Sequence, residues 1–201
     1  MTMLQPSFAS SGILVVFALE AEAQGCFDDF NPIYCGVGKV NAAYRLTRSL
    51  AQWRAVHGVP PELVLNLGSA GSAFFKAGSV VNCTKFIQRD FDVTPLGHDP
   101  YITPYEGIPA TLANGLRYNS HPEGVCGTGD SFVTSGAATA WNLVDMEAYA
   151  LAKVCHFEDI PFGCLKYITD GADGQAATSW EAGLADTATK LREAVAPIAG
   201  K

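Results

Sequence analysis

Short apolar runs that end abruptly in glycine or carboxylate residues most constrain the fold of this chain. Ile13–Phe17 is a continuous run rich in β-branched side chains, and Glu20 and Glu22 follow it closely. A continuous run of this kind is typical of a strand covered on both faces. Further strands are expected at residues 33–35, 63–67, 80–87, 125–128 and 162–168.

Segments with helical periodicity lie between these runs. The apolar face of the first predicted helix comprises Val40, Ala43, Leu46, Leu50, Trp53 and Val56. Residues 143–157 predict a second helix, with Met146 on its apolar stripe and Glu147 beside it in mid-helix. Residues 178–181 (TSWE) resemble a capping box that opens a third, with one apolar face at Trp180, Leu184, Ala188, Leu191 and Val195. Residues 89–124 are expected to be mostly loop.

Alternating strands and helices predict a single-domain α/β fold over residues 1–201. We expect a three-layer sandwich, with a central mostly parallel mixed sheet and helices on both faces. Ligands of such sheets bind at the carboxyl ends of the strands. Four predicted strand ends carry polar or glycine-rich residues: Glu20 and Glu22, residues 68–71, residues 129–130, and Asp170. This edge of the sheet is the predicted site.

Composition excludes several classes of function. The net charge of −7 argues against a nucleic-acid or anionic-membrane surface, which would need a basic face. The six cysteines form no CxxC pair and have no histidine at zinc-finger spacing, so we expect reduced, buried thiols. The apolar run near the N-terminus is too short to span a bilayer and follows no basic segment. A cytoplasmic location is therefore expected.

Seven motifs in order resemble the nucleoside phosphorylase superfamily, and within it the 5′-methylthioadenosine/S-adenosylhomocysteine nucleosidases. They are residues 18–22 (ALEAE), 36–40 (GVGKV), 66–71 (NLGSAG), 89–94 (RDFDVT), 129–133 (GDSFV), 145–148 (DMEA) and 168–173 (ITDGAD). Each is weak alone, but together they cover most of the chain. The resemblance implies a nucleoside phosphorylase-like fold and cleavage of a purine nucleoside, with no metal or organic cofactor.

The resemblance also implies residue roles. Glu22 matches the glutamate that activates the attacking water, and Asp170 the aspartate that protonates the purine at N7. Glu147 matches the glutamate that grips the ribose hydroxyls. The remaining residues implied in substrate binding are Ser69, Ala70, Gly71, Phe132, Val133, Asp145 and Met146, with Phe132 stacking on the base and the Val133 backbone reading its edge.

These residue types suit the chemistry. Bond cleavage leaves positive charge on the ribose and negative charge on the purine, so Asp170 must carry or share a proton when the substrate binds. A second carboxylate must be ionised to take a proton from water, a division of labour familiar from glycoside hydrolysis. The hydrogen bonds of a third, Glu147, to the ribose hydroxyls are charge-assisted.

Water is favoured over phosphate as the nucleophile. A phosphorylase must hold a dianion, but the first strand leads to Glu20 and Glu22, and no arginine occurs before Arg45. A carboxylate in that place would repel phosphate. Two alternatives stay open: a phosphate-dependent phosphorylase, and a catalytically silent nucleoside-binding protein.

The chain also departs from the family pattern. The stretch between Phe132 and Leu143 and the loop before Gly124 are shorter than usual, Asp145 stands where glutamate is common, and Lys166 where arginine is common. These changes leave the 5′ substituent of the substrate open. A homodimer is the expected assembly.

Overall fold

The computed structural model describes residues 12–118, 120–134 and 140–199, so both ends of the predicted domain and residues 135–139 of the shortened stretch lie outside it. The strands are β1 (Ile13–Phe17), β2 (Ile33–Tyr34), β3 (Leu63–Gly71), β4 (Val80–Gln88), β5 (Thr111–Leu112), β6 (Glu123–Thr128), β7 (Leu143–Asp145) and β8 (Phe162–Asp170). The helices are α1 (Glu20–Ala23), α2 (Lys39–His57), α3 (Ala148–Phe157) and α4 (Ala176–Ala199), with 3₁₀ turns η1 (Asp28–Phe30) and η2 (Thr94–Leu96).

The strands form one mixed sheet in the order β2-β1-β3-β7-β6-β4-β5, and β8 pairs with both β3 and β4. Five pairings are parallel, whereas β3–β7, β4–β5 and β4–β8 are antiparallel. Because β8 bridges β3 and β4, the strands β3, β7, β6, β4 and β8 close into a ring. The predicted mostly parallel mixed sheet is confirmed, and its closure is an addition that strand periodicity could not reveal.

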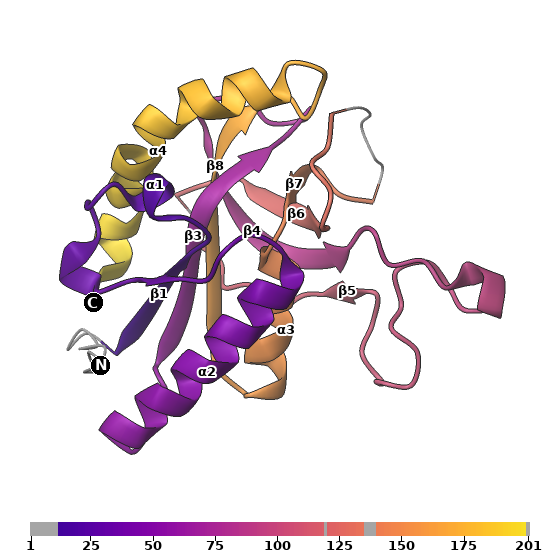
Figure 1. The fold of residues 1–201 in the computed structure, drawn as a ribbon, viewed down its shortest axis with the longest axis horizontal. Coiled ribbons are helices and arrows are strands. Elements are labelled where there is room, and N and C mark those ends of the chain that lie inside the picture. The colour runs from indigo at the N-terminus through magenta and orange to yellow at the C-terminus, as the bar shows by residue number, and fades with distance from the viewer. Residues whose placement is uncertain (1–11, 119, 135–139, 200–201) are drawn as a thin grey trace, which may run out of the picture.

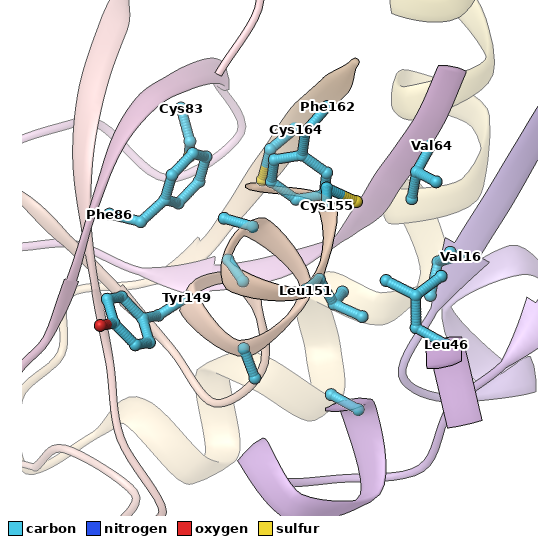
Figure 2. Close-up of a cluster of buried hydrophobic side chains, with 14 of the residues drawn as sticks. Val16, Leu46, Val64, Cys83, Phe86, Tyr149, Leu151, Cys155, Phe162 and Cys164 are labelled. Carbon is cyan, nitrogen blue, oxygen red and sulfur yellow. The ribbon is translucent and has the colours of Figure 1, made fainter. Parts of the chain in front are cut away.

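Helices cover the sheet on two sides (Figure 1). One apolar core lies between the sheet and α2 and α3, and Figure 2 shows its strand residues Phe86, Phe162 and Cys164 around α3. A second core lies on the other face, where Leu191 and Val195 of α4 pack against Leu65 and Leu165. The expected three-layer α/β arrangement is therefore present. None of the described helices is long and apolar enough to cross a membrane.

The buried face of α2 differs from the predicted one. Its buried residues are Ala42, Leu46, Ser49, Leu50 and Trp53. Val40 and Val56 were predicted to share this face, but they are 78% and 57% exposed. At 100° per residue both fall outside the stripe centred on Leu46 and Leu50, although their three- and four-residue spacing to single neighbours suggested otherwise.

Two predicted boundaries, the end of β3 and the start of α3, were wrong. Strand β3 does not stop at Gly68, because β8 pairs with it in parallel register from Val64 to Gly71. Residues 143–145 are not helical: they form β7, which pairs with β6, and α3 begins only at Ala148. A stretch of three residues fits a period of 2 or 3.6 equally well, so only pairing with a neighbour decides its structure.

The last helix also begins earlier than the capping box at residues 178–181 predicted. Helix α4 starts at Ala176, whose N–H donates to the Asp173 carbonyl oxygen. The Asp173 carboxylate accepts the Gln175 N–H at 2.9 Å, so an aspartate turn initiates the helix. Trp180 therefore lies inside the helix.

Gly115 lies close against the backbone of β4. A Cβ there would lie 2.4 Å from the Cys83 carbonyl oxygen and 2.7 Å from Thr84 Cα, so Gly115 provides a test of this close approach. We expect Gly115→Ala to overpack this contact and to destabilise the fold by about 1–3 kcal/mol. In thermal unfolding, each kcal/mol lowers Tm by about 2–4 °C for a chain of this length. Gly174→Ala is the control, because no atom lies within 4 Å of its Cβ position. Equal Tm values for the two variants would contradict the packing.

Candidate active site

A cavity of about 230 Å³ lies where the carboxyl ends of the strands meet. Most of its lining residues lie at or just after the ends of β1, β3, β4, β6, β7 and β8, whereas Val37 follows β2 and Trp180 comes from α4. The full lining is Ala18, Leu19, Glu22, Val37, Ser69, Ala70, Gly71, Arg89, Ser131, Phe132, Val133, Val144, Asp145, Met146, Glu147, Asp170 and Trp180. All ten site residues predicted from the sequence are among them. Their separate roles stay predictions.

Glu22 is buried in the short helix α1, and its carboxylate is anchored on β3. Oε1 accepts the Ser69 backbone N–H at 2.8 Å and the Ser69 hydroxyl at 2.7 Å. Oε2 accepts the Leu19 N–H at 3.2 Å. A Cβ at Gly68 would lie 3.0 Å from Oε1, so glycine at this point of β3 is what lets the carboxylate reach the strand.

Asp170 is the buried last residue of β8, and it faces the end of β3. Oδ1 accepts the Ala172 N–H at 2.9 Å, and Oδ2 accepts the Thr169 hydroxyl at 2.8 Å. A Cβ on Gly71 would lie 2.5 Å from Oδ1. Each of the two predicted catalytic carboxyl groups thus packs against a glycine of the same strand.

Asp145, which lines the cavity, forms a buried ion pair with Lys166, with 2.9 Å between Oδ2 and Nζ. Asp145 also accepts hydrogen bonds from the Thr128 hydroxyl at 2.6 Å, the Ala148 N–H at 2.8 Å and the Cys126 thiol at 3.3 Å. Burial opposes its charge, but Lys166 and these donors outweigh burial and lower the pKa of Asp145. Because its oxygens are already engaged, Asp145 acts here as an anchor for β7 and α3.

Glu147 lies at the start of α3, not in mid-helix as predicted. Oε1 accepts the Gly38 N–H at 2.9 Å, and Gly38 has a φ of +93°, a conformation that glycine adopts readily. Burial, followed by the charge of Asp145, raises the pKa of Glu147 from 4.5 to about 8. Lys166 lowers it only in part, since that ammonium is paired with Asp145.

Phe132 and Val133 reach the cavity from the segment after β6. Phe132 is 49% exposed, so it does not belong to the core, and its ring is accessible for stacking on a base. Arg89 holds this segment: its guanidinium donates to the Ser131 hydroxyl at 3.1 Å, to the Gly129 carbonyl at 3.3 Å and to the Ser131 carbonyl.

Seven cavity residues were absent from the predicted set: Ala18, Leu19, Val37, Arg89, Ser131, Val144 and Trp180. Trp180 was assigned to a helix face, Arg89 was noted only within a motif, and Val37 only within a glycine-rich turn. The carboxyl-end rule could have identified Arg89, which follows β4 directly. No pattern in the sequence placed Trp180 near β3. Among the described residues, no group of three or more His, Cys, Asp or Glu side chains could hold a metal ion.

The raised pKa of Glu147 predicts a pH-dependent effect of Glu147→Gln on stability. The folded state binds this proton more tightly than the unfolded state, so burying the ionised form costs stability progressively from pH 4.5 to about 8. Glutamine keeps an acceptor for the Gly38 N–H but does not ionise. We expect Tm of the variant to match the wild type near pH 5 and to exceed it by at least about 2 °C at pH 9.

The matched control for this experiment is Glu20→Gln, because Glu20 is an exposed carboxylate of α1. Because this side chain is exposed, the Tm of the variant should stay close to that of the wild type. A difference for Glu147→Gln that did not change between pH 5 and pH 9 would contradict a buried carboxyl group that resists ionisation.

Comparison with known proteins places this site in a family. The family described as "Phosphorylase superfamily" matches residues 32–199. The 5′-methylthioadenosine/S-adenosylhomocysteine nucleosidase of Actinobacillus succinogenes is 33% identical, over 73% of this chain and 70% of the relative. The enzyme of the same name from Anoxybacillus flavithermus is 31% identical, over 80% and 75% of the two chains.

A solved structure shares the fold. The Helicobacter pylori 5′-methylthioadenosine/S-adenosylhomocysteine nucleosidase, crystallised with a substituted pyrrolidinol, superposes with a TM-score of 0.79 at 21% identity. The superposition covers 94% of this chain and 97% of the other. With the ordered motifs, the fold and the curated relatives in agreement, this chain belongs to the phosphorylase superfamily and, within it, to the 5′-methylthioadenosine/S-adenosylhomocysteine nucleosidases.

Proposed function

We propose that this protein hydrolyses the N-glycosidic bond of an adenine nucleoside such as methylthioadenosine or adenosylhomocysteine and releases the free base. The observation that carries the proposal is the pair Glu22 and Asp170. Both carboxyl groups are buried, line one cavity and are held by different donors against the end of β3. Acid and base work can be divided between two such groups.

The proposed reaction uses water as the second substrate. Glu22 takes a proton from the water as its oxygen attacks the anomeric carbon of the ribose. The bond from that carbon to the purine breaks, its electron pair goes to the base, and the Asp170 carboxyl group donates a proton to N7. Glu147 binds the ribose hydroxyls, Phe132 stacks on the base, and the Val133 backbone reads the base edge.

The electrostatics of the site support water over phosphate. The Lys166 ammonium, which would lie 3.4 Å from a Cβ at Gly68 of β3, is buried and paired with Asp145. The Arg89 guanidinium donates to the segment that carries Phe132. A phosphate dianion beside Glu22 would therefore meet a carboxylate before a free cation, and that contact is repulsive.

We propose further that residues 1–201 form one domain that acts in the cytoplasm as a homodimer. All six cysteines are free, which fits a reducing compartment. Val40 and Tyr44 of α2 are 78% and 62% exposed, close in sequence to Val37 at the cavity. Such apolar side chains on the surface support an interface with a second copy.

Base release from methylthioadenosine, adenosylhomocysteine, adenosine and inosine, measured with and without phosphate, tests the function. We expect release of adenine without phosphate and no ribose 1-phosphate. Release that requires phosphate would make the protein a phosphorylase and overturn the role of Glu22. Nucleoside binding by calorimetry with no release from any of the four would identify a silent binding protein.

Asp170→Asn tests the general acid. Asparagine can accept the Ala172 N–H but cannot protonate N7, so turnover of the best substrate should fall by about 10²–10⁴-fold with the fold intact. Asp173→Asn, three residues further on and exposed, should keep nearly full turnover. Near-normal rates for Asp170→Asn would remove Asp170 from the mechanism.

A further inference from the structure

Trp180 is joined to the predicted water-activating carboxylate through a single hydroxyl group. Its indole Nε1–H donates to Ser69 Oγ at 3.0 Å, and Ser69 Oγ donates to Glu22 Oε1 at 2.7 Å. These two hydrogen bonds connect α4, β3 and α1, which are far apart in sequence. Trp180 also lines the cavity beside Ser69 and Glu22.

The donor and acceptor in each of these two hydrogen bonds follow from the chemical groups involved. An indole N–H can only donate, an ionised carboxylate can only accept, and a hydroxyl has one proton with two acceptor positions. With Trp180 occupying an acceptor position of Ser69 Oγ, the one hydroxyl proton is directed to Glu22. Together with the Ser69 N–H this gives Oε1 two donors, whereas Oε2 has one, from Leu19 at 3.2 Å. Oε2 is therefore the oxygen with room for a proton from water.

The position of Trp180 relative to Glu22 has independent support. Gln24, which follows α1, donates from its side-chain amide to the Leu184 carbonyl of α4 at 2.5 Å. Leu184 is one helical turn beyond Trp180. The two helices are thus joined at two points, and α4 holds its indole over the end of β3.

We propose that Trp180 is a positioning residue for Glu22: through Ser69 it orients the carboxylate so that Oε1 stays saturated and Oε2 accepts the proton of the attacking water. This inference rests on the proposed function. It deepens that function, because it gives a residue of α4 a part in preparing the base. Trp180 acts through its hydrogen bond to Ser69, and this bond does not touch the reacting atoms.

Trp180→Phe removes the N–H and keeps an aromatic ring in place. We expect kcat to fall about 3- to 10-fold, the range for losing one neutral hydrogen bond, while KM changes less than about twofold. Thermal unfolding of each variant establishes that it is folded.

The double variant separates positioning from packing. Ser69→Ala removes the hydroxyl, so Trp180→Phe should cause no further loss of kcat in that background. If Trp180 only packed against the cavity, the two losses would multiply, and that result would overturn the proposal. Unchanged kcat in the single Trp180→Phe variant would overturn it as well.

A measurement without substrate tests the hydrogen bond itself. In ¹⁵N-labelled protein the three tryptophans give separate indole N–H signals, and Trp180→Phe identifies one of them. In Ser69→Ala this signal should move upfield and exchange faster with solvent. An unchanged signal would show that the bond is absent. Lack of base release by the wild type would overturn the proposed function. An active wild type whose kcat is unchanged by Trp180→Phe would overturn only the positioning role of Trp180.

Discussion

The buried ion pair between Lys166 and Asp145 is the interaction on which the arrangement of the site depends. Moving two charges out of water costs several kcal/mol each, which only close pairing and further hydrogen bonds can offset. Asp145 meets this condition with donors from β6, β8 and the first turn of α3, and so ties three elements together. One consequence is chemical: burial and the charge of Asp145 raise the pKa of Glu147, and Lys166, which is paired with Asp145, lowers it only in part.

Glycine in β3 is the second constraint, and it links packing to chemistry. Glu22 and Asp170 come from opposite ends of the chain, yet both approach this strand more closely than a side chain would allow. The space of the missing Cβ is taken at Gly68 by the Glu22 carboxylate and at Gly71 by the Asp170 carboxyl group. The glycines continue the β3–β8 ladder instead of breaking it, so strand and site are built from the same residues.

Strand β1, the alternation of strands and helices, and the edge that holds the site could all be predicted, because apolar runs and their polar ends are local signals. The resemblance of seven motifs added the ten cavity residues. The three-residue strand β7 could not be predicted, since several periods fit such a short pattern. The buried face of α2 was predicted only in part, because Val40 and Val56 were assigned to it from their spacing to single neighbours. The place of Trp180 in the cavity could not be predicted for a different reason. Trp180 reaches Ser69 only when α4 packs across β3, and no local sequence pattern indicates that contact.

The fold class, the polar strand ends and the family follow from the amino-acid sequence, since each depends on residue type, order and short-range spacing. Three features became visible only in the folded protein: the sheet closes through β8, Asp145 is paired with Lys166, and Trp180, Ser69 and Glu22 are joined by hydrogen bonds. The physical reason is that the strength and direction of these interactions depend on burial and on distances between segments far apart in sequence. Those quantities exist only once the chain has folded.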